Sequence, residues 1–211
     1  MHIKIGIDES GKGDFFGGLS IAAVLIAVEK EKELKEAGVK DCKKLSEKKI
    51  FKLENLIKEI SKYSVVYISP KRYNELHLKM GSINKILAWG HARALENVLK
   101  DIDVEEEDIV AISDKFGDEK WLKRALMKKG RKIKLLQIPK AEEEICVASA
   151  SILARAEFLR RFNQLIERYG IEFKRGATSL VTEPAREFIK RYGKSRLIEV
   201  AKVHFSIFNR L

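Results

Sequence analysis

The 211-residue sequence contains few prolines and cysteines and no low-complexity stretch. With only three prolines and 45% hydrophobic residues, the chain has too much capacity for burial to be a disordered polypeptide. Its two cysteines, Cys42 and Cys146, are far apart in the sequence, and no Cys/His spacing suits a zinc site. These shortages exclude a disulfide framework and a zinc module, and they indicate a reduced, cytoplasmic setting.

Long apolar runs are also missing. The longest, around residues 21–28, is too short to cross a bilayer and predicts a buried strand instead. The N-terminal residues alternate like a strand from the start, so no export signal fits there. We therefore expect a cytoplasmic protein with no membrane partner, and nothing in the sequence indicates an obligate protein partner.

Positive charge, by contrast, is in excess. Lys and Arg total 42 against 31 Asp and Glu, which gives a net charge of +11 and an isoelectric point near 9.5. A strongly basic chain favours a polyanionic partner, of which nucleic acid is the commonest.

Hydrophobic periodicity predicts an α/β protein with a mixed sheet. The first two strands are close enough to pair antiparallel, while the last two enclose a short helix, which predicts a parallel crossover. The Lys/Glu-rich segment 29–40 is expected to be exposed, and residues from about 171 to 211 to form a helical extension of a single domain spanning 1–211. Strands are expected at about 3–8, 18–28, 63–68, 109–113 and 132–138, and helices at about 46–61, 71–80, 82–100, 119–128, 142–169, 183–192 and 195–203.

The densest candidate site is the stretch DESGKGDFFGG, residues 8–18. Residues 6–12 satisfy the spacing of a phosphate-binding loop, but Gly13 stands where that motif needs Ser or Thr. The carboxylates of Asp8 and Glu9 would moreover repel a phosphate. Adjacent acids at a strand end suit hard divalent cations, which take oxygen ligands. The alternative is a solvated strand end that binds nothing.

Two more acids follow predicted strands. Asp114 ends an apolar strand and Glu142 begins a helix just after another, positions where open α/β sheets commonly carry functional groups. Alternatively, Glu142 complements the helix dipole and Asp114 starts a turn. Four carboxylates in a chain of net charge +11 would form an anionic pocket ringed by cations, which metal-assisted attack on a phosphodiester requires.

Other polar residues can be interpreted either as ordinary structural residues or as functional ones. Lys43 and Lys44 precede a predicted helix, where a solvated face and phosphate contact are both open. Trp89 and His91 lie in a predicted helix, where a packed core Trp and a hydrogen-bonded His are favoured over a catalytic role.

Taken together, these segments resemble the type 2/type 3 ribonuclease H family, and ribonuclease HIII within it. Residues 8–17 look like the family signature, with Ser10 and Lys12 where type 2 enzymes typically have Ala and Arg. Lys12 and Glu142 favour type 3, because type 2 enzymes have Asp at the position of Glu142. Further similar segments follow in order across nearly the whole chain, at 41–45, 84–91, 114–116, 140–142 and 150–155.

The resemblance implies a ribonuclease H-like fold, a mixed sheet flanked by helices. It also implies hydrolysis of the RNA strand of RNA/DNA hybrids with Mg²⁺ or Mn²⁺, giving 5′-phosphate and 3′-hydroxyl ends. Type 2-like cleavage at single ribonucleotides in DNA duplexes, or hybrid binding without catalysis, are the alternatives. It assigns four acids to catalysis and metal binding, Asp8, Glu9, Asp114 and Glu142, and it assigns substrate contacts to Ser10, Gly11, Lys12, Gly13, Cys42, Lys43, Lys44 and Ser151.

The segment from Gly11 to Gly13 corresponds in this resemblance to the backbone that senses ribose 2′-hydroxyls. Three departures from the family pattern stand out. Cys42 occupies a position where the family usually has Ser, and a thiol is a weak donor. The stretch before residues 150–152 is about one residue short, so Glu143 could take the role of Glu142. Finally, the N-terminal substrate-binding domain that ribonuclease HIII usually carries is not expected in this chain, which is either naturally short or trimmed.

Overall fold

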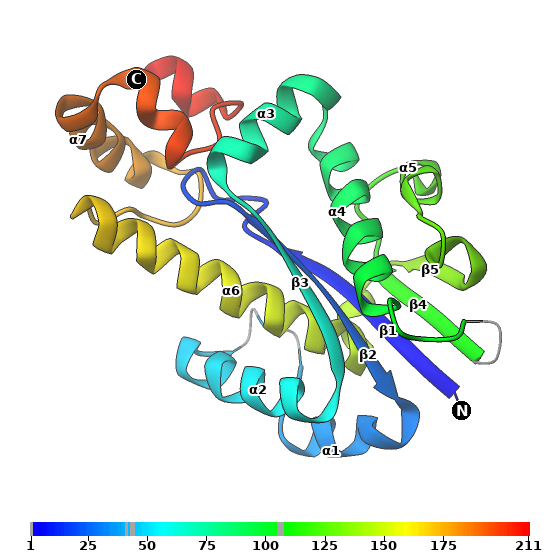
Figure 1. Cartoon of the computed structure of the whole chain (residues 1–211). Helices are drawn as coiled ribbons and strands as arrows, with labels where there is room; N and C mark the ends of the chain where they lie inside the picture. The colour runs from blue at the N-terminus through cyan, green and yellow to red at the C-terminus, as the bar shows by residue number, and fades with distance from the viewer. Residues whose placement is uncertain (1, 41, 43–44, 105–107) are drawn as a thin grey trace.

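A five-stranded sheet forms the centre of the computed structural model, which describes residues 2–40, 42, 45–104 and 108–211 (Figure 1). The strand order is β3-β2-β1-β4-β5. β1 pairs antiparallel with β2 and parallel with β4, so the predicted mixed sheet is confirmed, including the parallel β4–β5 crossover. The strands are β1 (His2–Ser10), β2 (Leu19–Ala27), β3 (Lys62–Ile68), β4 (Asp108–Asp114) and β5 (Lys134–Ile138).

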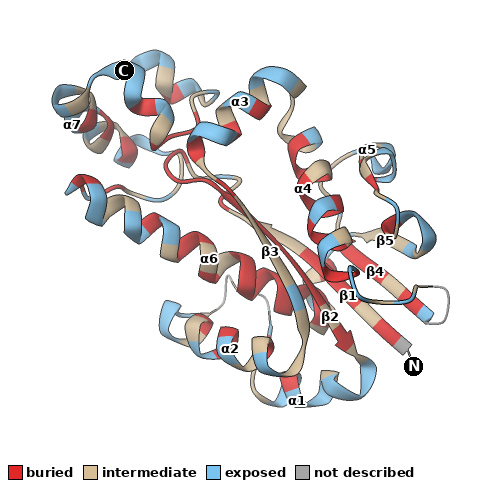
Figure 2. Cartoon of the chain, viewed as in Figure 1, coloured by how far each residue is buried: buried red, intermediate tan, exposed pale blue. Residues whose placement is uncertain are grey.

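Helices cover both faces of this sheet (Figure 1). One face carries α6 (Ile145–Tyr169), with α2 (Glu47–Ile60) and α1 (Glu31–Glu36) beside it. The other face carries α4 (Ile83–Val98), with α3 (Pro70–Met80) and α5 (Glu119–Ala125). Figure 2 shows the buried residues concentrated in β1, β2 and the sheet-facing sides of α4 and α6.

The alternation of β1 explains how the two helical layers attach. Ile3, Ile5 and Ile7 belong to the core cluster under α4, because every second side chain of a strand points to the same face. On the opposite face Gly6 has no side chain, and a Cβ there would lie 2.0 Å from the Cys146 carbonyl carbon. The backbone of α6 therefore packs directly on β1, which brings the first half of α6 alongside the end of that strand.

The helix limits largely follow their predicted start and stop signals. Ser46 caps α2 by accepting a hydrogen bond from the Lys49 amide (3.3 Å), and Gly170, at φ 60°, ends α6. The long helix, however, begins at Ile145 and not at Glu142. A left-handed residue, Lys140 at φ 56°, and a 3₁₀ turn (Ala141–Glu143) precede it, so the expected start was wrong by three residues.

The expectation that residues 29–40 are exposed was wrong at two positions. Leu34 of α1 is fully buried and Val39, just after that helix, is 3% exposed, because both pack into the cluster beneath α6, while the charged residues of α1 other than Glu31 are exposed. The Lys/Glu-rich composition of this segment gave no hydrophobic pattern that would predict this short amphipathic helix.

The predicted helical C-terminal extension is confirmed by α7 (Thr182–Tyr192). Residues 195–203, expected to be helical, instead form a 3₁₀ segment (Lys194–Glu199) followed by a β-bridge from Ala201 to Phe16. An aromatic cluster joins the extension to the loop after β1, with Phe15 and Phe16 packed among Phe158, Phe173 and Phe188. Among the helices of the described ranges, none has both the length and the apolar character that crossing a bilayer needs.

Candidate active site

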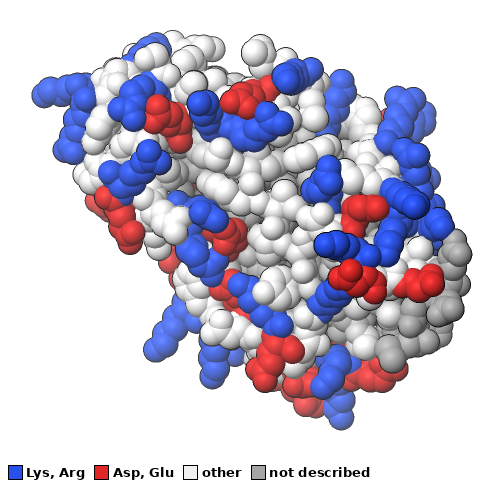
Figure 3. Space-filling view, in the orientation of Figure 1, with Lys and Arg blue, Asp and Glu red and all other residues white. Residues whose placement is uncertain are grey.

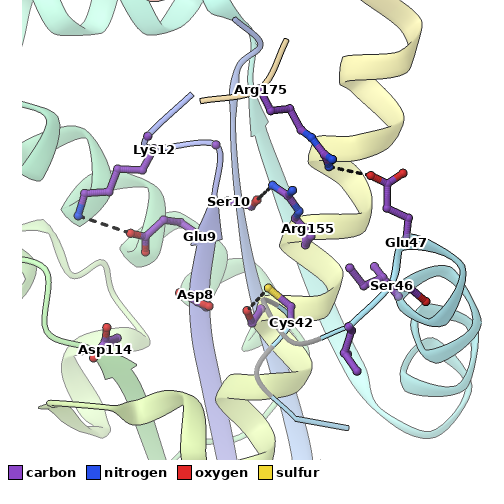
Figure 4. A pocket seen from close by; sticks show the side chains of 15 residues that line it. Asp8, Glu9, Ser10, Lys12, Cys42, Ser46, Glu47, Asp114, Arg155 and Arg175 are labelled. Carbon is purple, nitrogen blue, oxygen red and sulfur yellow. Dashed lines mark hydrogen bonds and ion pairs between the residues drawn. The ribbon is translucent and has the colours of Figure 1, made fainter. Parts of the chain in front are cut away.

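A cavity of about 710 Å³ opens where β1 and β4 end (Figure 4). The two strands run parallel, and Ile7 is in register with Ser113, so Asp8 and Asp114 are the next residues along both strands. The lining contains most of the sequence-predicted site, namely Asp8, Glu9, Ser10, Gly11, Lys12, Gly13, Cys42, Asp114 and Ser151. Residues that are far apart in the sequence thus meet at the carboxyl ends of β1 and β4.

Asp8 lies at the floor of this cavity on the α6 side of β1. Burial, together with the charges of Glu9 and Asp114, raises the pKa of its carboxyl to about 7, although hydrogen bonds from the Glu9 backbone and the Ser151 side chain lower it in part. A partly buried carboxylate beside two others is costly as an anion unless a cation offsets the charge. This electrostatic arrangement therefore fits a bound divalent cation.

Glu9 points to the opposite face of β1. Its Oε2 lies 3.0 Å from Nε2 of His91 on α4, and its Oε1 lies 3.8 Å from the Nζ of Lys12. The side chain of Glu9 is 12% exposed, whereas that of His91 is 1% exposed. Two adjacent acids are therefore fixed by different layers of the fold, Asp8 by α6 and Glu9 by α4.

The loop after β1 requires glycine at one position and leaves space at another. Gly11 has φ 96°, and a Cβ there would lie 2.5 Å from the Gly18 carbonyl oxygen and 2.6 Å from the Phe158 ring. At Gly13 a Cβ would meet no atom within 4 Å. Gly11 is thus required for the turn itself, while the backbone at Gly13 is open to a ligand in the cavity.

Cys42 and Ser151 are in direct contact in the lining of the cavity, with the Ser151 Oγ 3.0 Å from the Cys42 Sγ, and Figure 4 labels Cys42. The Ser151 side chain also forms a hydrogen bond with the Asp8 carboxylate, so α6 contributes directly to the acidic end of the site. The predicted phosphate contacts Lys43 and Lys44 lie outside the described residues.

Sequence reasoning gave no role to two arginines that line the same cavity. Arg155, one turn of α6 beyond Ser151, places Nη1 3.5 Å from Ser10 Oγ, and Arg175 pairs with Glu47 at 2.7 Å (Figure 4). Arg155 could have been found from its place in the similar segment 150–155. Arg175 carried no sequence signal, because a contact across 128 residues depends on how the extension packs.

The fourth predicted acid, Glu142, is not among the described residues that line this cavity. Glu142 is half-buried in the 3₁₀ turn before α6, and Glu143 is exposed. Glu143 lines a separate hollow together with Glu31 and Glu144, and Glu144 pairs with Lys4 at 3.2 Å. The choice between Glu142 and Glu143 therefore stays a prediction.

The acids present suit a hard cation by their chemistry. Within the described ranges, no group of three or more Asp, Glu, His or Cys side chains is close enough together to hold an ion alone. Mg²⁺ commonly uses one or two carboxylates together with waters and substrate phosphates. Asp8 and Asp114, with Glu9 adjacent, provide carboxylates for such a site, and the poorly solvated charge at Asp8 favours a cation there.

The family model for ribonuclease HII matches residues 5–208 of this chain. The ribonuclease HIII of Chlamydia pneumoniae is 40% identical over 213 residues, an alignment that covers 100% of this chain and 70% of that protein. The chain belongs to the type 2/type 3 ribonuclease H family. This ribonuclease H also superposes on two solved relatives across nearly all of its length.

One relative is Bst-RNase HIII in complex with Mn²⁺, with a TM-score of 0.89 and 29% identity over 99% of this chain and 68% of that one. The other is the ribonuclease H2 of Pyrococcus horikoshii OT3, with a TM-score of 0.82 and 25% identity over 99% and 96%. The resemblance to ribonuclease HIII is thus confirmed, and this chain is a ribonuclease H enzyme with the fold of both types.

Proposed function

We propose that this ribonuclease H is a metal-dependent endonuclease that hydrolyses the RNA strand of RNA/DNA hybrids, leaving 5′-phosphate and 3′-hydroxyl ends. The observation that carries the proposal is the meeting of Asp8, Glu9 and Asp114 with the glycine loop 11–13 in one cavity. These partly buried acids would supply a metal site, and the open backbone beside them would supply a surface for the sugar. The net charge of +11 supports a nucleic-acid substrate.

Asp8 and Asp114 would hold Mg²⁺ or Mn²⁺, with Glu9 as a further ligand or a contact to water. A bound divalent metal supplies an activated water and stabilises the leaving 3′-oxygen. Ser151 orients Asp8 through its hydroxyl, and Lys12 lies within ion-pair reach of Glu9. Arg155 and Arg175 at the other end of the cavity would offset phosphate charge, as the predicted contacts Lys43 and Lys44 would.

Basic side chains extend beyond the cavity. Figure 3 shows Lys and Arg spread widely over the face in view, with carboxylates interspersed among them. We further propose that residues 1–211 act as one catalytic domain, because the extension packs its aromatic cluster on Phe15 and Phe16. Cys42 and Cys146 are not joined in a disulfide, which supports a cytoplasmic setting.

The direct test is a cleavage assay with two substrates. The pure protein is incubated with a uniform RNA/DNA hybrid and with a DNA duplex that contains one ribonucleotide, each with Mg²⁺, Mn²⁺ or EDTA. We expect cleavage of the hybrid with metal and none with EDTA, and phosphatase treatment of the products should identify 5′-phosphate ends. No cleavage with any metal would sink the proposal, and cutting only at the single ribonucleotide would show type 2-like activity.

The fourth acid can be identified by comparing Glu142→Gln with Glu143→Gln. We expect the first to lower the rate of hybrid cleavage by about 10- to 100-fold, the range typical of residues that support a metal site. The second should have little effect, because Glu143 is exposed and lines a different hollow. Steady-state rates at saturating metal measure both, and a loss confined to Glu143→Gln would transfer the role to that residue.

A further inference from the structure

The carboxylate of Glu9 is held from behind by a buried imidazole. His91 comes from α4, 82 residues away in the sequence, and its Nε2 lies 3.0 Å from Glu9 Oε2. The His91 side chain is 1% exposed, so this contact is shielded from water. A hydrogen bond in such surroundings constrains a carboxylate more strongly than one at the surface does.

The hydrogen bond fixes which nitrogen of His91 carries hydrogen. Nδ1 is buried and has no partner among the residues that the structure describes. With hydrogen on Nδ1, the ring would bury an unpaired N–H and turn a lone pair towards a carboxylate oxygen. With hydrogen on Nε2, the ring donates to Glu9 and leaves only an unused acceptor at Nδ1. The imidazole therefore acts as an Nε2–H donor.

The ring itself has little freedom to move. Phe116 packs against it with the ring centroids 4.6 Å apart and the planes at 58°. The helix that carries His91 also lies close to the sheet, since a Cβ at the preceding Gly90 would come within 2.6 Å of Ile21 Cδ1. A packed ring on a closely packed helix offers a donor at a fixed point.

An apolar residue would be the ordinary choice at this position of α4. Leu87, Ala88 and Leu95 belong to the apolar core cluster, and burying a polar ring among such residues is costly unless its hydrogen bond compensates. The hydrogen bond of this ring goes to an acid that lines the candidate active site. The Nζ of Lys12 lies 3.8 Å from the other oxygen of the same carboxylate, so each carboxylate oxygen of Glu9 has its own partner.

We propose that His91 is a positioning residue, which orients Glu9 for its part in the metal site. The inference rests on the proposed function, since it assigns Glu9 to metal or water contact. His91 itself lies behind Glu9 and is not among the described residues that line the cavity. Its effect is therefore expected on metal affinity and turnover and not on the binding of the hybrid.

The test compares His91→Leu with His91→Gln. Leu fills similar space without a donor, whereas the longer amide of Gln can place an N–H near the position of Nε2. We expect His91→Leu to lower kcat for hybrid cleavage by about 10- to 100-fold, to raise the Mn²⁺ concentration for half-maximal rate and to leave KM nearly unchanged. His91→Gln should recover most of the loss.

A control variant separates positioning from stability. Leu95→Ala lies on the same helix in the same core cluster and should lower the melting temperature while leaving kcat and the Mn²⁺ dependence unchanged. If His91→Leu does not fold, His91→Asn replaces it, because the shorter amide cannot reach Glu9. A donor-free variant with wild-type kcat and Mn²⁺ dependence would overturn the inference.

A direct measurement of Mn²⁺ binding tests the positioning role of His91 independently of the proposed function. Electron paramagnetic resonance of Mn²⁺ titrated into the protein reports affinity without any substrate. If the wild-type protein cleaves nothing, the proposed function fails, and the inference still predicts weaker Mn²⁺ binding by His91→Leu than by the wild type and His91→Gln. Equal binding by all three proteins would refute the positioning role.

Discussion

Replacing Asp8 with asparagine is expected to lower hybrid cleavage by about 10³-fold or more. The amide keeps the shape of the side chain but loses the charge that would hold the cation, and a metal ion contributes several kcal/mol to such a reaction. Asp114→Asn should have a comparable effect, because Asp114 ends the neighbouring parallel strand and lines the same cavity. Single-turnover rates with Mg²⁺ and with Mn²⁺ measure both losses.

The variant proteins should remain folded. Burial and the charge of Glu9 disfavour the charged form of Asp8, so removing that charge should not lower the melting temperature measured in EDTA. Hybrid binding should persist or tighten as repulsion of phosphate falls. Asp118→Asn is the matched control, since it removes one carboxylate from an exposed helix cap outside the cavity, and Asn also caps helices. Near-normal turnover in Asp8→Asn or Asp114→Asn would show that the assigned metal site is wrong.

The strands and most helices could be predicted because each has a local signal. Ile3, Ile5 and Ile7 alternate in the sequence and pack on one face in the fold. Ser46 is a good N-cap and forms that cap. These signals depend on neighbours within one turn or one strand, which is the range over which a single sequence is informative.

Contacts between distant segments could not be predicted in the same way. The hydrogen bond from His91 to Glu9 joins α4 to β1 only because the sheet alternation sends Glu9 to that face. The pair of Arg175 and Glu47 depends on the packing of the extension against α2. The start of α6 was mispredicted because the left-handed turn at Lys140 is uncommon for a residue with a side chain.

A buried lysine explains how the extension supports the loop that carries Lys12 and Gly13. Lys202 is fully buried, and its Nζ donates to the carbonyl oxygens of Asp14 (2.6 Å) and Gly17 (2.8 Å). Backbone bonds complete the attachment, from the Lys202 amide to the Phe15 carbonyl (2.8 Å) and from the Gly17 amide to the Val200 carbonyl (2.8 Å). The position of the glycine loop therefore depends on residues from the far end of the chain.

Lys202→Met should lower both the free energy of unfolding and the rate of cleavage. The substitution removes the Lys202 donor from the buried carbonyl of Gly17 and the partly buried carbonyl of Asp14, and a buried group left without its partner costs about 1–3 kcal/mol. Loosening the loop should also reduce turnover, because the loop follows directly from Asp8 and Glu9. Urea unfolding and hybrid cleavage measure the two effects. Lys190→Met, an exposed lysine on α7 of the same extension, should change neither.

The stability difference between wild type and Lys202→Met should depend on pH. Burial lowers the pKa of Lys202 from 10.5 to about 7, although the nearby Asp14 charge raises it somewhat. The ring centroid of Tyr73 lies 5.7 Å from the Nζ of Lys202. His204 interacts electrostatically with Lys202, and the pKa of His204 is lowered to about 4 by burial and by the charges of His77 and Lys202. Between about pH 7 and pH 10 the unfolded chain holds the proton of Lys202 and the folded chain has released it.

Wild-type stability relative to the variant should therefore rise with pH across this window, and the advantage should be smallest below about pH 7, where the folded protein must bury the charged ammonium. Unfolding curves of both proteins at about pH 6 and about pH 9 test the sign directly. An advantage that is constant with pH would show that the buried ammonium keeps its proton throughout. Equal stability of the two proteins at both values would show that Lys202 does not fasten the extension to the loop.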